Sequence, residues 1–432
     1  MQSRGGVQTP LRARPVFTTA LVLVVLLLFE SPFANQVDST PQRAMALVGG
    51  RIYISPMEDP IPNGVILAKQ GKITAVGPRA TVAIPEGTEI LDCSGLTVVA
   101  GLWNSHVHFT ERKWADASKI PTAELREQLE AMLVQYGFTS VFDTGSMWDN
   151  TRRLRDRIES GEIPGPRIRS TGEILFPKGA APPELILDVT GSMRVTMPEV
   201  ADAAEALTAA RKHLDAGTDG IKLYAATWAP PIVSLPESVI RAAADEAHRR
   251  HRPVFAHPSN REGLLAAVRG GADILVHTTP QAGPWDEAII AEMKEAEVAV
   301  IPTLKLWRHE LRHDRISELE QFARRGVDQL RAWRAVGGEV LFGTDVGYVD
   351  DYDPGDEYAL MAKAGMSASQ ILASLTTVPA KRFGDAKRLG RIATGFAADL
   401  TVLSEDPSEN VRAFAAVRYT IRHGIVIYRA SR

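Results

Sequence analysis

Cysteine is almost absent from this chain, since Cys93 is the only one among its 432 residues. The absence excludes an intramolecular disulfide and any metal site built from clustered cysteines. A bound metal would therefore have to use histidine, carboxylate or a less usual ligand.

An excess of charge of either sign is missing as well. The chain has 49 Lys and Arg against 52 Asp and Glu, which gives a net charge of −3. With so balanced a charge and no strongly basic stretch, there is no electrostatic basis for nucleic-acid binding. We expect a small-molecule substrate instead. No coiled-coil heptad is present to indicate an oligomer.

The longest apolar run near the N-terminus is too short to span a bilayer comfortably. Residues 1–15 contain three arginines and no acid, and the fourteen residues from Val16 to Phe29 carry no charge. A span needs about 20 residues, whereas a positive segment before a short apolar run is typical of an export signal. Cleavage after Ala34 would place Pro32 at the −3 position, which is a poor cleavage site. We predict that residues 1–35 are a signal peptide, or a membrane anchor if uncleaved, on an exported, extracytoplasmic protein. A disordered leader on a cytosolic enzyme remains the alternative.

The rest of the chain has enough apolar residues, 45% of the total, for a large core. Between Ala46 and Val99, short alternating strands are separated by Gly, Asn and Pro, which is typical of a small β-domain. After Gly101, apolar runs alternate with amphipathic helical segments such as residues 235–250. Eight runs are expected to be strands: 102–109, 139–145, 167–174, 220–226, 253–258, 273–278, 298–304 and 339–347.

Eight repeated β/α units are typical of a (β/α)8 TIM barrel of about 250 residues. After Arg388 the strand pattern returns, in residues 390–403 and 416–430. We therefore predict an α/β fold with the barrel at residues 100–387. Residues 45–99 and 388–432 are expected to form one discontinuous β-sandwich domain.

Unusual polar residues follow the predicted barrel strands. Of ten histidines, four lie at the carboxyl ends of strands, and the others lie in charge-rich helical stretches or in the C-terminal tail. A lysine and an aspartate share this placement, and the set is His106, His108, Lys222, His257, His277 and Asp345. Barrel enzymes build their active sites at this end of the strands. Six such residues on five strands are hard to explain by packing.

The spacing of these residues has a chemical reason. Alternate residues of a strand point to the same side, so His106 and His108 can bind one ion together. Imidazoles suit Zn²⁺ and similar metals, and Asp345 adds negative charge and a proton acceptor. The ammonium of Lys222 would be repelled by a dication, but a lysine carbamylated by CO₂ is negative and offers two bridging oxygens. Burial lowers the pKa of a lysine enough for that reaction. Alternatively, Lys222 is an ordinary charge partner or a substrate-binding cation beside a single metal.

The motifs that carry these residues resemble the amidohydrolase superfamily, more closely its imidazolonepropionase-like and prolidase-like members. The first-strand motif appears as AGLWNSHVHF, in which Ala100 replaces the usual Pro and Asn104 the usual Asp. The other segments follow in the expected order: GFTSVFDTGS, SGEIPGPRI, DGIKLYAA, PVFAHPSN, DILVHTTP, FGTDVG and RIATGFAADLTVLSEDP. The resemblance covers nearly everything after residue 45.

The resemblance implies a metal-dependent hydrolase with a defined ligand set. His106, His108 and Asp345 would bind one divalent transition metal, His257 and His277 a second, and carbamylated Lys222 would bridge both. Zinc is the favoured metal, and a single metal stays open. The departures at Ala100 and Asn104 lie outside the ligands, so we expect them to affect local support more than metal count.

The implied reaction is hydrolysis of a C–N bond in an amide, lactam, carbamate or dipeptide. Metal-activated hydroxide would attack the carbonyl, and Asp345 would pass a proton to the leaving nitrogen. A mononuclear-metal deaminase is the alternative within the superfamily. The loops after the strands offer Tyr224, Thr227, Trp228, Asn260, Thr278, Thr279, Trp285, Lys305, Trp307 and Tyr348. We predict that Tyr224, Trp228, Thr278 and Tyr348 bind substrate, that the aromatic residues favour an apolar or ring-bearing group, and that about half of this set only packs loops.

Three competing functions are disfavoured. Residues 309–313 match the HExxH zinc-protease motif, but charged neighbours place them on a solvated helix after the seventh strand. Residues 143–145 spell the Asp-Thr-Gly of aspartic proteases, yet no second copy exists and the segment fits the second barrel strand. A non-catalytic exported binding protein on a decayed barrel should have lost at least one of the six polar residues, and all are present.

Overall fold

The computed structural model describes residues 44–180, 197–228, 231–311 and 316–431, except for the side chains of residues 316–319. The predicted export segment, residues 1–35, lies outside the described residues. Within them, no helix is both long and apolar enough to cross a membrane.

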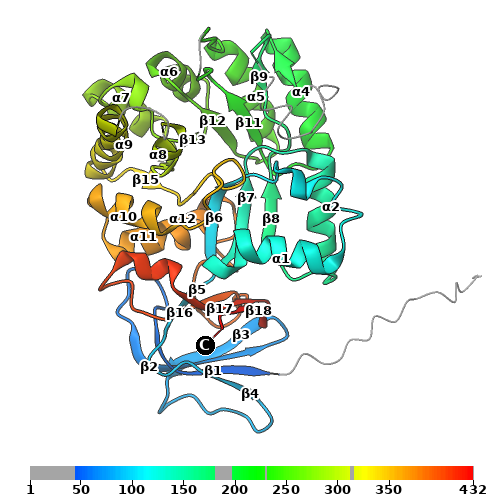
Figure 1. The fold of residues 1–432 in the computed structure, drawn as a ribbon, viewed down its shortest axis with the longest axis vertical. Helices are drawn as coiled ribbons and strands as arrows, with labels where there is room; N and C mark the ends of the chain where they lie inside the picture. The colour runs from blue at the N-terminus through cyan, green and yellow to red at the C-terminus, as the bar shows by residue number, and fades with distance from the viewer. Residues whose placement is uncertain (1–43, 181–196, 229–230, 312–315, 432) are drawn as a thin grey trace, which may run out of the picture. The chain divides into compact units, whose positions relative to one another are not determined.

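Strands from the two ends of the chain share one sheet (Figure 1). The N-terminal part supplies β1 (Met45–Ile52), β2 (Ile61–Lys69), β3 (Lys72–Pro78), β4 (Glu89–Asp92) and β5 (Thr97–Ala100). The C-terminal part supplies β16 (Leu400–Leu403), β17 (Val417–Arg422) and β18 (Ile425–Arg429). The order is β18-β17-β16-β5-β1-β2-β3, with β4 beside β1. The antiparallel pairing of β5 with β16, from Thr97 opposite Leu403 to Ala100 opposite Leu400, joins the two parts.

Eight parallel strands lie between these two parts of the chain, one within each predicted run. One parallel sheet contains β6 (Leu102–Val107), β7 (Phe138–Asp143) and β8 (Arg167–Ser170). The other contains β11 (Ile221–Tyr224), β12 (Val254–His257), β13 (Ile274–Val276), β14 (Ala299–Ile301) and β15 (Glu339–Val340). Their residues, polar ones included, are buried almost throughout because parallel strands are covered on both faces. The short β9 (Phe176–Pro177) and β10 (Glu199–Val200) pair separately.

Backbone contacts link the two parallel sheets at both of their edges. The amide of Ser105 in β6 donates to the carbonyl of Phe342, just after β15, at 2.8 Å. On the other side, Leu175 bridges Leu223 of β11 in parallel register, and its amide donates to the carbonyl of Lys222 at 3.0 Å. The protein has a TIM-barrel-type α/β fold.

Helices separate the parallel strands (Figure 1). They are α1 (Thr122–Met132), α2 (Trp148–Glu159), α4 (Ala203–Asp215), α5 (Glu237–Arg249), α6 (Arg261–Arg269), α7 (Glu287–Glu295), α8 (Leu306–Glu310), α9 (Ile316–Ala335), α10 (Gly355–Lys363), α11 (Ala368–Leu375) and α12 (Thr377–Arg382). Short 3-10 turns cover Arg112–Trp114, Val134–Tyr136, Pro280–Ala282 and Val411–Ala415. Side-chain caps fix several helix starts: Asp202 accepts from two amides of α4, and Ser367 forms a capping box with Gln370 in α11.

A buried ion pair ties β8 to the segment just before β16. Nη1 of Arg167 lies 3.0 Å from Oδ2 of Asp399, and their side chains are 10% and 4% exposed. The same guanidinium donates to Oγ of Ser140 in β7, and Oδ1 of Asp399 accepts from the amide of His423. The parallel strands and the C-terminal β-hairpin are therefore connected through one carboxylate.

Replacing Asp399 by alanine should be strongly destabilising because it leaves the buried Arg167 guanidinium without its counterion. Breaking a buried pair typically costs about 3–5 kcal/mol, so we expect a loss of that order in the free energy of unfolding measured by urea denaturation. Glu58→Ala is the control, because Glu58 and Arg391 are 3.4 Å apart and about half exposed. That pair should contribute about 1 kcal/mol or less. Equal losses in the two variants would contradict the assigned role of Asp399.

Candidate metal centre

The six polar residues predicted from the strand ends are all buried at the carboxyl ends of the parallel strands. His106 lies in β6, with His108 just beyond it, and Lys222 lies in β11. His257 is the last residue of β12, His277 follows β13 and Asp345 follows β15. Each is at most 8% exposed. Residues far apart in the sequence therefore meet in one solvent-poor region.

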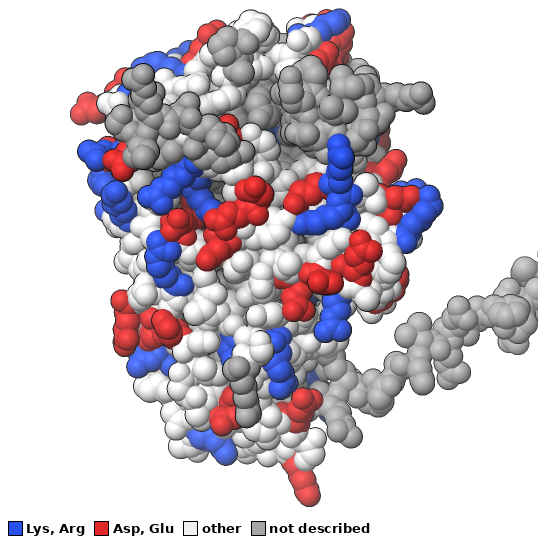
Figure 2. Space-filling view, in the orientation of Figure 1, with Lys and Arg blue, Asp and Glu red and all other residues white. Residues whose placement is uncertain are grey.

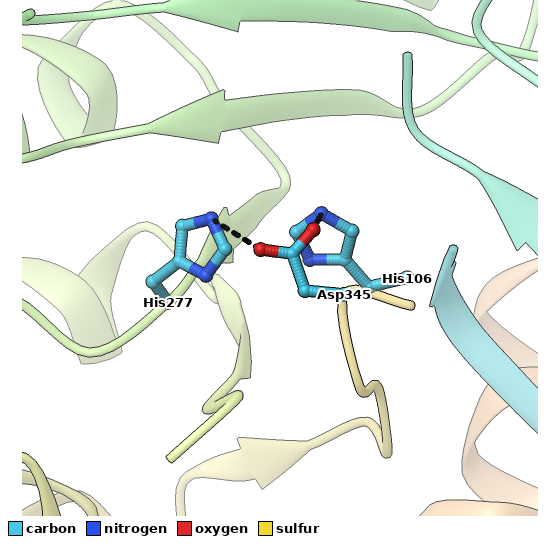
Figure 3. A group of neighbouring side chains, drawn as sticks. All are labelled: His106, His277 and Asp345. Carbon is cyan, nitrogen blue, oxygen red and sulfur yellow. Dashed lines mark ion pairs between the residues drawn. The ribbon is translucent and has the colours of Figure 1, made fainter. Parts of the chain in front are cut away.

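The carboxylate of Asp345 lies between the rings of His106 and His277 (Figure 3). Its Oδ1 is 3.2 Å from Nε2 of His106 and 2.9 Å from Nε2 of His108, and its Oδ2 is 3.9 Å from Nε2 of His277. One ligand atom from each of His106, His277 and Asp345 lies within 4.8 Å of the other two. These three residues could hold one metal ion.

His257 and Lys222 extend this group. The ring of His257 lies 4.7 Å from that of His277, centroid to centroid. Lys222 is buried close enough to the histidines and to Asp345 for their charges to interact. Burial lowers the pKa of Lys222 to about 7, although Asp345 and Asp143 oppose the shift. In the described part of the chain, no carboxylate lies within 4.0 Å of its Nζ.

Hydrogen bonds on the far side of two rings orient their inner nitrogens. Nδ1 of His108 donates to the carbonyl oxygen of Gly145 at 2.6 Å, and since a carbonyl only accepts, that nitrogen carries the proton. Nδ1 of His277 lies 2.5 Å from Oγ1 of Thr303. Ligating histidines are typically held by such outer partners. Sequence reasoning missed both partners. Thr303 follows β14, so its strand-end position was a usable signal, whereas Gly145 acts through its backbone and had none.

The donor set fits a divalent cation. Burial lowers the pKa of His106 to about 4 and the pKa of His257 and of His277 well below the usual value, so these rings are neutral at pH 7. Burial alone would raise the pKa of Asp345, but His106 and its neighbours hold it well below the usual value, so the carboxylate is ionised. Oδ1 of Asp345 accepts no hydrogen bond of acceptable geometry from any described residue. Nitrogen lone pairs and an unpartnered anionic oxygen facing one another are what a transition metal requires.

Asp143, at the end of β7, is a second buried carboxylate near this group. Its Oδ2 accepts from the hydroxyls of Ser146 and Ser170, each at 2.5 Å, and its Oδ1 accepts from the amide of Gly145. Burial raises its pKa. The structure places residue 143 on the second parallel strand, as predicted. Its proximity to the site was missed, although it has the same strand-end position as the ligand candidates.

The backbone carrying the site is strained. His277, Thr303 and Asp345 have φ values of 76°, 40° and 61°, in the left-handed region that costs an L-residue about 1–2 kcal/mol. Such strain persists only where the surroundings enforce it, and it is concentrated at functional sites. Close approach also demands glycine next to Asp345, because a Cβ on Gly347 would lie 1.8 Å from the carbonyl oxygen of His108.

The amidohydrolase family model matches residues 97–426. This chain belongs to the amidohydrolase family. The resemblance inferred from the motifs is thereby confirmed, and the protein is a hydrolase of carbon–nitrogen bonds. The family is generally metal-dependent, in agreement with the donor set described above.

Individual relatives align with most of this amidohydrolase. The ochratoxinase of Aspergillus niger is 24% identical over 420 residues, covering 88% of this chain and 85% of the relative. A candidate prolidase from Bifidobacterium longum, of known structure, is 26% identical with a TM-score of 0.75, covering 90% of this chain and 95% of its own. A Xaa-Pro dipeptidase with bound methionine has a TM-score of 0.76 at 22% identity, covering 90% and 100% of the two chains, and supports the fold.

Asn104, where this amidohydrolase departs from the family motif, supports the site without belonging to it. Its Nδ2 donates to Oγ1 of Thr344 at 2.6 Å, and its Oδ1 accepts from the amides of His106 and Thr344 at 3.2 and 3.3 Å. The side chain therefore connects β6 to the segment that carries Asp345.

Three of the residues predicted to bind substrate lie next to the site or at its edge. The ring of Tyr224 stacks on His257 with centroids 4.0 Å apart and planes 10° apart. The hydroxyl of Tyr348, a residue that is 46% exposed, donates to Oε1 of Glu310 at 2.6 Å. Thr278 is buried, and its Oγ1 accepts from Nε1 of Trp307. Contact of any of them with substrate stays a prediction.

Trp228, the fourth predicted substrate residue, belongs to an aromatic group. Its ring stacks on Trp307 with centroids 5.5 Å apart and meets Phe322 edge-on. Trp307 in turn lies 6.0 Å from His277, centroid to centroid. The aromatic side chains therefore reach the candidate metal ligands.

The remaining polar loop residues named in the sequence have partners within the loops. Nε1 of Trp285 donates to Oγ1 of Thr279, and Nζ of Lys305 donates to the carbonyls of Asp351 and Asp353. The hydroxyl of Thr227 accepts from the amide of Val233. The side chain of Asn260 caps α6 by accepting from the amide of Gly263.

The first two residues of the HExxH segment, His309 and Glu310, end α8, which follows the seventh strand. The His309 side chain is only 13% exposed, so it is less solvated than predicted. Nδ1 of His309 is 3.4 Å from Oδ1 of Asp350, and Glu310 binds Tyr348. His313 lies outside the described residues. The metal-compatible group found among the described side chains contains neither His309 nor Glu310.

Gly347→Ala should disrupt the site, because the new Cβ would overlap the carbonyl oxygen of His108. We expect the metal content, measured by elemental analysis, to fall together with the melting temperature. Gly161→Ala is the matched control: its φ is +80°, close to the +97° of Gly347, but no atom lies within 4 Å of its Cβ position. That variant should suffer only the conformational cost of about 1–2 kcal/mol. Full metal binding by Gly347→Ala would show that the close approach is unimportant.

Proposed function

We propose that this amidohydrolase cleaves an amide-type bond of a small molecule, in an amide, lactam, carbamate or dipeptide, with two divalent transition metals, preferably zinc. The observation that carries the proposal is the convergence of neutral imidazoles on an ionised carboxylate oxygen that lacks a hydrogen-bond donor among the described residues. His106, His108 and Asp345 would hold one metal, and His257 and His277 the other.

Lys222 would bridge the two metals as a carbamate. The neutral amine adds to CO₂ and loses a proton, which gives an anionic carbamate with two oxygens. A pKa near 7 leaves a large fraction of the amine neutral at physiological pH, and the side chain is 1% exposed. A buried carbamate is protected from water and needs a positive partner, which the two metals would provide.

The protein side chains would orient the metal-binding rings and transfer a proton. When bound, the metals supply a nucleophilic hydroxide at neutral pH and polarise the scissile carbonyl. Asp345 would accept the proton of the attacking water and deliver it to the leaving nitrogen. The carbonyl of Gly145 and the hydroxyl of Thr303 keep the rings of His108 and His277 turned inward. The stacked ring of Tyr224 covers one face of His257 and limits access of bulk water.

The names of the relatives favour the dipeptide among these substrate classes. A dipeptidase acts on dipeptides, and both a candidate prolidase and a Xaa-Pro dipeptidase share the fold over 90% of this chain. Tyr224, Trp228, Thr278 and Tyr348 would contact the substrate, with the aromatic rings favouring an apolar or ring-bearing group.

A closed (β/α)8 barrel and a two-layer β-sandwich complete the proposal. The contacts of β6 with Phe342 and of Leu175 with β11 support closure. For the sandwich, β1 pairs with β4 along its first half and with β5 at its end, so its two neighbours diverge. Boundaries at 45–99, 100–387 and 388–432 belong to the same proposal.

A mononuclear deaminase is the second candidate. The three-residue group of His106, His277 and Asp345 is sufficient for a single ion. In that case Lys222 would remain an amine that binds substrate or balances charge.

Metal content per chain separates the two candidates. We expect about two metals per chain on protein starting near residue 36, fewer in Lys222→Ala, and a carbamate carbon signal by NMR after labelling with ¹³CO₂. Dipeptide hydrolysis should disappear with chelator and return with Zn²⁺. The exposed Lys212→Ala is the control and should behave as the parent.

One metal in both the parent and Lys222→Ala would favour the deaminase. An absence of metal after reconstitution would refute the catalytic proposal as a whole.

We also propose that the protein is exported, through residues 1–35, as a cleaved or membrane-anchored form. Cell fractionation with mass measurement of the N-terminus tests this. A mature chain starting near residue 36 would show cleavage, and an intact chain in the membrane fraction would show anchoring. An intact chain in the cytosol would refute export.

A further inference from the structure

Glu310, the last residue of α8, is connected to the candidate metal centre through Tyr348. The hydroxyl of Tyr348 donates to its Oε1 at 2.6 Å. Tyr348 comes three residues after Asp345 in a tight turn, in which the amides of Tyr348 and Val349 donate to the carbonyl of Asp345 at 3.1 and 2.9 Å. The position of the Glu310 carboxylate is thus tied to the same turn that positions Asp345.

The hydroxyl of Tyr348 stays protonated and donates the hydrogen bond to Glu310. Although 46% of the residue is exposed, desolvation of its phenol group, followed by the charge and hydrogen bond of Glu310, raises the pKa of Tyr348 above its usual value. The pKa of Tyr224 is also raised, by burial and by the charges of Asp345 and Glu310. Glu310, the two phenols and Asp345 therefore lie within electrostatic reach of one another.

Among the described residues, Glu310 has no cationic partner. No lysine or arginine in the described ranges lies within 4.0 Å of its carboxylate. Two described cations of the same segment bind other carboxylates: Lys305 binds Asp351, and Arg308 lies 3.4 Å from Asp356. The carboxylate also lies at the carboxyl end of α8, where the free carbonyls disfavour negative charge and favour a cation. Tyr348 satisfies a lone pair of Glu310 but does not neutralise its charge.

Two aromatic residues contact the histidines of the candidate site. Tyr224 stacks on His257, and the ring of Trp307, three residues before Glu310, lies 6.0 Å from that of His277, centroid to centroid. A carboxylate combined with aromatic faces is the usual environment of a bound ammonium group.

We propose that Glu310, held by Tyr348, binds a cationic group of the substrate, an ammonium or a guanidinium. This inference rests on the proposed function for its site, and it adds the charge of the substrate. Tyr348 is a positioning residue in this scheme, and Glu310 sets specificity.

Glu310→Gln separates charge recognition from a purely structural role. The amide oxygen of glutamine still accepts from Tyr348, so the variant keeps the connection and removes the charge. If Glu310 has only a structural role, the preference for a cationic over a neutral ligand should not change in this variant. If Glu310 recognises charge, that preference should be lost. Glu295→Gln, an exposed carboxylate on α7, is the matched control.

Binding is measured by calorimetry with 2-phenylethylammonium and its neutral analogue 2-phenylethanol on the metal-loaded protein. We expect the parent and Glu295→Gln to bind the ammonium at least about tenfold more tightly, the effect of one charged hydrogen bond. In Glu310→Gln the two affinities should become equal. Tyr348→Phe keeps the charge and should retain part of the preference, which tests the proposal independently if Glu310→Gln is unstable. Equal affinities in the parent, or a preference unchanged in Glu310→Gln, would overturn the proposal.

Hydrolysis tests the proposed function separately. Lysyl-alanine, norleucyl-alanine and hexanoyl-alanine contain the same amide bond. The first has a side-chain amine and an α-amine, the second only the α-amine, and the third neither. Recognition of either amine by Glu310 would therefore change the rate along the series. Preference in both binding and kcat/KM supports both proposals. Ammonium binding without hydrolysis of any of these compounds would support the cation site and refute dipeptide hydrolysis. Hydrolysis without any charge preference would support dipeptide hydrolysis and refute the cation site.

Discussion

The arrangement of the site depends on a buried negative charge, the Asp345 carboxylate, at the ends of the parallel strands. Neutral imidazole nitrogens and the ionised carboxylate of Asp345 face one another in a region that water barely reaches. A buried anion without donors is costly, and a divalent cation is the simplest solution. The outer hydrogen bonds of His108 and His277 and the left-handed backbone at Asp345 all serve to maintain this geometry.

Maintaining strained residues requires a rigid support. The parallel strands are packed on both faces, and their ends meet through backbone hydrogen bonds such as that from Ser105 to Phe342. At β7 and β8, Arg167 connects Ser140 to Asp399, which links the strands to the C-terminal hairpin. The sheet shared by the two chain ends is thus joined to the parallel strands that carry the site.

The chemistry and the choice of substrate reside in different parts of the molecule. Bond cleavage, as we propose it, belongs to strand-end residues in the family motifs. Selectivity, as we propose it, belongs to the loops, where Glu310 and Tyr348 meet from segments that follow different strands. Loops can vary without disturbing the strands beneath them, so one metal centre can serve many substrates. The mixed distribution of charges over the visible surface (Figure 2) offers no large basic patch as an alternative recognition surface.

The sequence by itself determined the eight strands, the return of the chain to the first sheet and all six buried polar candidates, because strand periodicity and strand-end position are local properties. His106 and His108 were recognisable from their spacing together with their position at a strand end. Only the tertiary structure revealed Thr303 behind His277, the carbonyl of Gly145 behind His108, and the pairing of Glu310 with Tyr348. These contacts join segments 26 to 38 residues apart, and no local pattern specifies which loops will meet. The need for glycine at 347 likewise arises only when the backbone of His108 is brought against it.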